Sequence, residues 1–93
     1  MARKELSKEQ KILNKFIGEK VKEYRMKTPF KRLTLSKAIH VTPIMIKRYE
    51  EGTYSISVST LLEICKTLGN CKLSDLIPNE QELERLHLLD PYS

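Results

Sequence analysis

Lys47 and Arg48 stand together in the stretch TLSKAIHVTPIMIKRYEEG, residues 34–52, in which several other side chains are large and apolar. A lysine ammonium binds phosphate, and an arginine guanidinium binds either phosphate or the hydrogen-bond acceptors of guanine. Ile46 and Tyr49, three positions apart, are spaced to face the core from one side of a helix. The side left toward solvent, and toward a negatively charged partner, is formed by Pro43, Ile44, Lys47 and Arg48.

Basic residues are concentrated in the first part of the chain. The net charge of the 93 residues is +5. Residues 1–56 contain 14 Lys and Arg against 6 Asp and Glu, whereas residues 57–93 contain 3 against 6. We therefore expect a polyanion to bind the first part. The alternative is a solvated basic face that binds nothing.

Length and composition predict one small domain with one hydrophobic core, because 40% of the residues are apolar and 31% are charged. No apolar run approaches the ~18 residues of a membrane span. Residues 1–5 include basic side chains but are not followed by the apolar segment of a secretory signal. We expect a cytoplasmic protein that does not enter a membrane.

Residues that carry catalysis or hold metals are few. Cys65 and Cys71, with only two histidines in the chain, match neither a disulfide framework nor a zinc pattern, so both are expected to be reduced thiols. The sequence contains no glycine-rich phosphate loop and no nucleophile set. We expect no enzyme activity, no cofactor, no metal and no small-molecule substrate.

Helix signals occur along the whole chain. Ser7 and Gln10 have capping-box spacing and begin a predicted amphipathic helix over residues 7–27. Thr28-Pro29 ends this helix. Shorter helices are predicted over 33–39, 43–51, 57–68 and 73–77, followed by a capped acidic segment from Asn79.

The third predicted helix has the clearest boundaries. Thr42 suits the N-cap, Pro43 suits the first helical position, and Gly52 suits a left-handed stop. Ser57 caps the fourth helix in the same way. An apolar stripe along the fourth helix is expected to face the core, and its residues are Val58, Leu61, Leu62, Cys65 and Leu68.

Residues 17–77 resemble the Cro and phage-repressor type of helix-turn-helix domain, in which two short helices are joined by a tight turn. The residues that carry the resemblance are Arg25, Leu35, Ser36, Ile39, Val41, Ile46, Tyr49, Glu50, Gly52 and the segment TLLEICKTLG. The resemblance implies an all-α, five-helix, lambda-repressor-like domain, here followed by a short C-terminal helical extension. It also implies that the third helix enters the major groove of DNA.

The resemblance further implies an ion pair between Arg25 and Glu50; the alternative is two unrelated surface charges. In the DNA-binding role, Arg48 would contact guanine or a phosphate, Lys47 a phosphate, and Ile44 a thymine methyl group. The full set of expected DNA-binding residues is Lys31, Arg32, Lys37, Thr42, Pro43, Ile44, Lys47, Arg48, Thr53, Tyr54, Ser55 and Ser57.

Two positions depart from the family pattern. Pro43 and Ile44 replace the polar, base-reading side chains that family members often carry. Base readout would then be poorer than usual, or would depend on methyl contacts and DNA shape. His40 stands at the turn position usually held by glycine, and we interpret it as a structural residue that tolerates positive φ, with a pH sensor as the alternative.

These observations predict a helix-turn-helix domain over residues 1–78 and an extension over 79–93. The predicted function is a transcriptional regulator, a repressor, that binds an operator in double-stranded DNA as a homodimer. The predicted dimer contact consists of Leu83, Leu86 and Leu89; alternatively, these leucines fold back on the monomer. The alternative function is a protein-interaction module on the same scaffold, such as an antitoxin or a regulator-binding adaptor.

Overall fold

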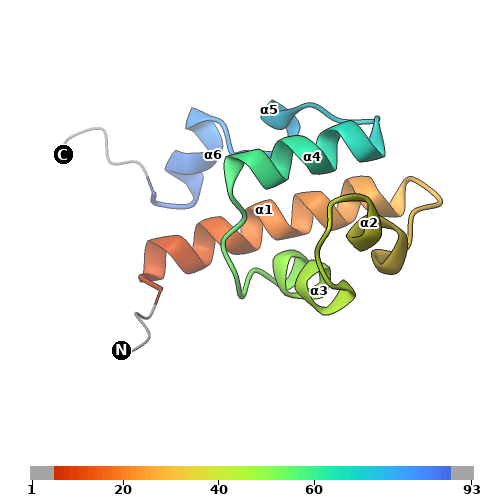
Figure 1. Ribbon diagram of the computed structural model, residues 1–93. Helices are drawn as coiled ribbons and strands as arrows, with labels where there is room; N and C mark the ends of the chain where they lie inside the picture. Colours follow the sequence, from red (N-terminus) through yellow and green to blue (C-terminus); the bar gives the residue numbers. More distant parts are fainter. Residues whose placement is uncertain (1–5, 89–93) are drawn as a thin grey trace.

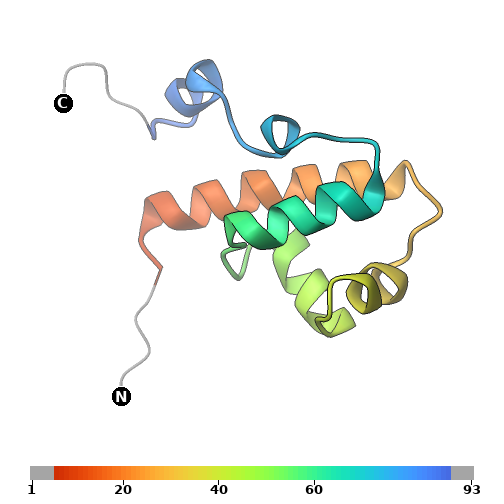
Figure 2. The ribbon, with the colours of Figure 1, turned by 45° about the horizontal axis from the view of Figure 1, so that its top comes forward.

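The computed structural model describes residues 6–88, which form helices and connecting loops with no strand in this range. The helices are α1 (Lys8–Met26), α2 (Arg32–Ala38), α3 (Pro43–Glu51), α4 (Val58–Leu68), α5 (Leu73–Leu76) and α6 (Glu80–Arg85). Helix α1 runs through the middle of the molecule, with α4 beside it (Figures 1 and 2). Helices α2 and α3 lie on one side of α1, and α5 and α6 lie on the other. The predicted all-α, five-helix fold is confirmed.

The helix ends follow local capping chemistry. The Ser7 backbone N–H donates to Gln10 Oε1 at 2.8 Å, and the Gln10 N–H donates to Ser7 Oγ at 3.2 Å, so the expected capping box is formed. Thr42 caps α3, Pro43 is its first residue, and Gly52 ends it with φ +80°. Each of these ends was predicted, because a cap depends on residues that are close together in the sequence.

The turn between α2 and α3 contains His40, which has φ +60°. The positive φ expected for this residue is confirmed, and histidine is among the residues that adopt the left-handed region more often than most others. The Val41 N–H donates to the Ser36 carbonyl at 3.0 Å and closes the turn. The turn brings α3 back against α2, and together they form the helix-turn-helix unit.

Helices α1 to α5 all contribute to one core. Its buried apolar side chains are Val21, Leu35, Ile39, Ile46, Leu61, Ile64, Cys65, Leu68 and Leu76. The prediction for α4 was wrong at Val58 and Leu62, whose residues are 58% and 41% exposed. Ile64, absent from the predicted stripe, is fully buried instead. The face that α4 turns inward is set by its neighbours, and its apolar residues extend beyond that face.

The backbones of α1 and α3 meet at two glycines. A Cβ atom on Gly18 would lie 2.8 Å from the Glu50 carbonyl oxygen and closer still to that of Tyr49. A Cβ atom on Gly52 would lie 2.6 Å from the Lys15 Cα. The end of α3 is therefore seated on α1 without intervening side chains, which fixes how far α3 stands out from the body of the domain.

Helix α6 stands apart from the other described helices. No Cα atom of α6 lies within 8 Å of a Cα atom in another helix of residues 6–88. Leu83 and Leu86 are half-buried and do not belong to the main core, and Leu89 lies outside the described residues. None of the described helices is long and apolar enough to cross a membrane.

Candidate nucleic-acid interface

Helix α3 divides into a buried side and an exposed side, as its sequence predicted. Ile46 is fully buried, and Tyr49 is half-buried against the core. Five residues of α3 are exposed, and Ile44 among them is 49% exposed. These exposed residues are Pro43, Ile44, Lys47 and Arg48, which the sequence predicted, and Glu51 at the end of the helix. They place an apolar tip at the beginning of α3 and two cations in its middle and last turns.

Two other expected DNA-binding residues lie at the two ends of α2, in the same helix-turn-helix unit. Lys31 lies at the N-cap of α2 and Lys37 in its last turn, and both are exposed. Lys37 and the two cations of α3 belong to the pair of helices on the side of α1 opposite to α6 (Figures 1 and 2). The helix-turn-helix unit thus gathers positive charge, whereas α6 carries Glu80, Glu82 and Glu84 against Arg85.

Hydroxyl groups beside α3 already have partners within the protein. Thr42 Oγ accepts the Met45 N–H at 3.3 Å, and Ser57 Oγ accepts the Thr60 N–H at 3.2 Å, so both hydroxyls cap helices. Asn14 Nδ2 donates to Ser55 Oγ at 2.9 Å. Any contact that these residues make with a ligand must share the hydroxyl with the helix cap or with Asn14.

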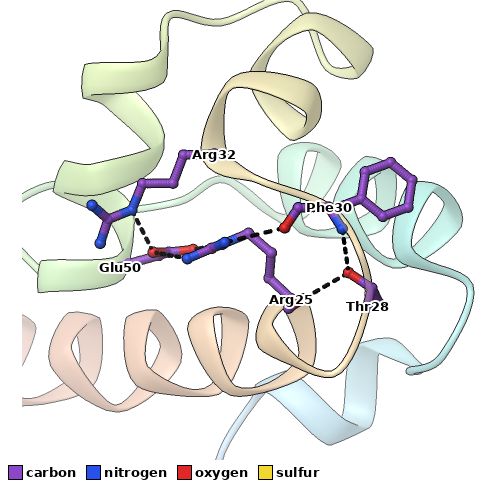
Figure 3. A network of polar contacts seen from close by, with 5 residues as sticks. All are labelled: Arg25, Thr28, Phe30, Arg32 and Glu50. Carbon is purple, nitrogen blue, oxygen red and sulfur yellow. Dashed lines mark hydrogen bonds and ion pairs between the residues drawn. The ribbon is translucent and has the colours of Figure 1, made fainter.

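The orientation of α3 is fixed by Glu50, whose side chain is 1% exposed. Arg25 Nε donates to Glu50 Oε2 at 2.5 Å, and Arg25 Nη2 donates to Oε1 at 3.1 Å (Figure 3). The ion pair that the resemblance implied is therefore formed. Such forked pairing of guanidinium and carboxylate is strong and directional. It ties the last turn of α3 to the last turn of α1.

A second arginine joins this pair. Arg32 Nε donates to Glu50 Oε1 at 2.9 Å from the first position of α2 (Figure 3). The sequence predicted Arg32 only as a DNA contact, and its pairing with Glu50 was missed. The Arg32–Glu50 contact depends on how α2 packs against α3, and a local sequence pattern does not contain that information. The Arg32 side chain is 35% exposed. It therefore reaches both the buried carboxylate and solvent.

The loop between α1 and α2 completes this network. Arg25 Nη1 donates to the Phe30 carbonyl at 3.2 Å, and the Phe30 N–H donates to Thr28 Oγ1 at 3.1 Å (Figure 3). Thr28 Oγ1 in turn donates to the Arg25 carbonyl at 2.6 Å. Across the described residues, no buried side-chain nitrogen or oxygen is left without a partner. The network joins α1, α2 and α3 into one support for the exposed side of α3.

Arg48 has an aromatic neighbour from the loop that follows α3. Its Cζ lies 5.2 Å from the centre of the Tyr54 ring, which is within the range of a cation–π contact. Tyr54 was predicted as a direct DNA contact, and its contact with Arg48 was missed. Arg48 and Tyr54 are six positions apart, and α3 ends between them at Gly52, so no sequence pattern indicates that their side chains are in contact.

The two cysteines lie together at the other end of α4. Cys65 Sγ and Cys71 Sγ are 3.9 Å apart, and both are free thiols. Burial, followed by the neighbouring Cys65, raises the pKa of Cys71 to about 12, so this thiol stays protonated at neutral pH. Within residues 6–88, no group of three or more His, Cys, Asp or Glu side chains is arranged to hold a metal ion.

Comparison with known proteins gives one result at the level of the family. Residues 21–76 match the model of the HTH_3 family, described as Helix-turn-helix, of the Cro/C1 type. No curated protein and no solved structure matches the chain. The matched range covers more than half of the 93 residues and contains the turn, the Glu50 network and the whole of α3. The chain therefore belongs to the Cro/C1-type helix-turn-helix family.

Proposed function

We propose that this protein is a sequence-specific DNA-binding transcriptional regulator that represses by occupying an operator. The observation that carries the proposal is the two-sided α3, which exposes Lys47 and Arg48 while Glu50 is held by two arginines on the buried side. A recognition helix needs both properties, because side chains that enter the major groove must be free and the helix that carries them must be fixed.

Four of the exposed residues of α3 have a role in this proposal. Arg48 forks to O6 and N7 of a guanine, and Lys47 binds a phosphate as a flexible point charge. Ile44 packs on a thymine methyl group, and Pro43 shapes the apolar tip beside it. Because this tip offers no hydrogen bond, preference at its base pairs depends on methyl contacts and DNA shape.

Residues around α3 bind the phosphates on either side of the groove. Lys31, Arg32 and Lys37 contribute from α2, and they are joined by residues near the ends of α3 and α4: Thr42, Thr53, Ser55 and Ser57. Phosphate contacts of this kind position the protein without reading sequence. No cofactor, catalytic group or small-molecule substrate enters the mechanism, and the protein acts in the cytoplasm.

Two copies of the domain, residues 1–78, bind two half-sites about 34 Å apart as a homodimer. Helix α6 and the leucines that follow it, residues 79–93, supply the contact between the copies. The position of α6 on the side of α1 away from α3 supports this arrangement, since a dimer contact there leaves both recognition helices free.

A protein-interaction module on the same scaffold is the second candidate. The exposed Val58 and Leu62, four residues apart on α4, favour it, because apolar side chains on one exposed face suit a protein partner. In that function, the basic side of α3 would not bind DNA with any sequence preference.

Selection of duplexes from a random library, followed by titration of the enriched duplex at several salt concentrations, tests the proposed function. We expect a common sequence to be enriched and the affinity to fall steeply with salt, because phosphate binding releases counterions. If no sequence is enriched and duplex binding is absent even at low salt, the DNA-binding function is wrong and the interaction module replaces it.

A further inference from the structure

The segment that follows α3 is held against the end of that helix. Gly52 turns the chain with φ +80°, and the N–H groups of Gly52 and Thr53 point back to the last turn of α3. The Thr53 N–H donates to the Arg48 carbonyl at 3.0 Å, and Thr53 Oγ1 donates to the same carbonyl at 3.1 Å. The backbone of Arg48 is thereby tied to the residue next to Tyr54.

The other side of the same segment is held by α1. Asn14, which is 8% exposed, donates through Nδ2 to Ser55 Oγ at 2.9 Å. Gly52 is in close contact with the backbone of α1 at Lys15. Tyr54 therefore lies between two anchored neighbours, with Thr53 bonded to α3 and Ser55 bonded to α1, and these bonds restrain the backbone that carries its ring.

The half-buried ring of Tyr54 is the surface on which Arg48 lies, since Arg48 Cζ is 5.2 Å from its centre. An exposed arginine on a free helix surface samples many rotamers. A ring beneath the guanidinium favours those that keep the contact. A contact with one ring leaves most of the five N–H donors of the guanidinium able to fork to a base.

We propose that Tyr54 is a positioning residue that directs the Arg48 guanidinium toward its base and so sets the base preference at that position. This inference rests on the proposed DNA-binding function and deepens it. It assigns to Tyr54 an action through Arg48, in place of a simple contact with a phosphate. It also makes the segment after α3 part of the specificity of the recognition helix.

Four variants test this role: Tyr54→Phe, Tyr54→Leu, Arg48→Ala, and Tyr54→Leu combined with Arg48→Ala. Affinity is measured by fluorescence anisotropy on the duplex that the parent protein enriches, and on duplexes with each base pair changed in turn. Tyr54→Leu is expected to weaken binding about two- to fivefold and to relax preference at one base pair, whereas Tyr54→Phe keeps both. In the Arg48→Ala background, Tyr54→Leu is expected to have no further effect.

The side-chain NMR signals of Arg48, recorded without DNA, test the ring contact itself. Ring-current shifts are expected in the parent and in Tyr54→Phe, and are lost in Tyr54→Leu. Circular dichroism and thermal melting verify that each variant is folded, and the comparison with Tyr54→Phe decides the matter if Tyr54→Leu does not fold.

Three results overturn the positioning role while the parent still binds DNA. They are an unchanged base preference in Tyr54→Leu, an equal loss of affinity from Tyr54→Leu with and without Arg48, and the absence of ring-current shifts in the parent. If Tyr54→Leu does not fold, a changed base preference in Tyr54→Phe overturns the role as well. If the parent binds no duplex at all, the proposed function itself fails and the positioning role fails with it.

Discussion

At Glu50, two guanidinium groups from different helices share one carboxylate that is almost completely removed from solvent. A buried ion pair adds little net stability in itself, because desolvation of the charges offsets their attraction. Removing one partner is strongly destabilising, because the remaining charge is then buried without compensation. Glu50 is therefore needed to hold Arg25 and Arg32 in place at the junction of α1, α2 and α3.

Replacement of Glu50 by alanine is expected to lower the free energy of unfolding by about 3 to 5 kcal/mol, because two arginines lose their shared carboxylate. Glu51→Ala is the matched control, since Glu51 is the next residue and is exposed. Its effect is expected to stay within about 0.5 kcal/mol. Urea denaturation followed by circular dichroism measures both, and equal losses in the two variants would show that the network does not hold the helices.

Lys47 and Arg48 are adjacent and exposed, yet different outcomes are expected from their replacement. Arg48→Ala should cost about 1 to 3 kcal/mol on the enriched duplex and relax the preference at one position. Lys47→Ala should weaken binding to all sequences alike and reduce the salt slope by about 1. Anisotropy titrations on the enriched and on a scrambled duplex separate these effects. If both variants bind as the parent does, α3 is not the reading element.

At the scale of elements, Gly18 determines how closely α3 approaches α1. Alanine in the middle of an isolated helix is more stable than glycine by about 0.5 to 1 kcal/mol. The structure predicts the opposite sign for Gly18→Ala, because the added Cβ would collide with the Tyr49 and Glu50 carbonyl groups. We expect a destabilisation of about 1 to 3 kcal/mol.

Thermal and urea denaturation of Gly18→Ala measure whether the substitution raises or lowers the free energy of unfolding. Lys22→Ala, at an exposed position of the same helix, is the control and is expected to change stability by less than about 0.5 kcal/mol. A Gly18→Ala variant that is more stable than the parent would contradict this close approach, because the backbones of α1 and α3 would then have room for a Cβ atom between them.

The same elements show which parts of the structure are readable from the sequence. Ser7, Thr42 and Gly52 fix helix ends through bonds to residues within a few positions, and these ends were predicted. The inward face of α4 and the partner of Arg32 depend on helices that are distant in the sequence, and there the prediction failed or was incomplete. The exposed side of α3 was predictable because Ile46 and Tyr49 identify the buried side.

For the whole molecule, the two sides of α1 have different properties. The helix-turn-helix unit on one side carries exposed cations, whereas α6 on the other carries three glutamates and half-buried leucines outside the core. DNA attracts the first side and repels the second. A dimer contact at α6 is therefore compatible with DNA binding by both copies at once.

Sedimentation of the full chain beside a version that ends at Pro78 tests the proposed dimer. We expect a dimer for the full chain and a folded monomer for the shorter one, because the shorter chain keeps the core but loses α6 and Leu83, Leu86 and Leu89. A full-length chain that sediments as a monomer at every concentration, with and without DNA, would contradict the dimer and indicate that the leucines cover the monomer's own surface.

The most direct test of DNA binding through α3 is a titration of the ¹⁵N-labelled full chain with the enriched duplex, followed through backbone amide shifts. The largest shifts are expected in residues 42–48, with smaller shifts near the beginnings of α2 and α4, because these segments lie beside the proposed groove and its phosphates. Helix α6 is expected to show no shift from DNA itself. Shifts confined to α6, or to Leu62 and the residues that follow it in α4, would contradict the proposal that α3 reads the operator.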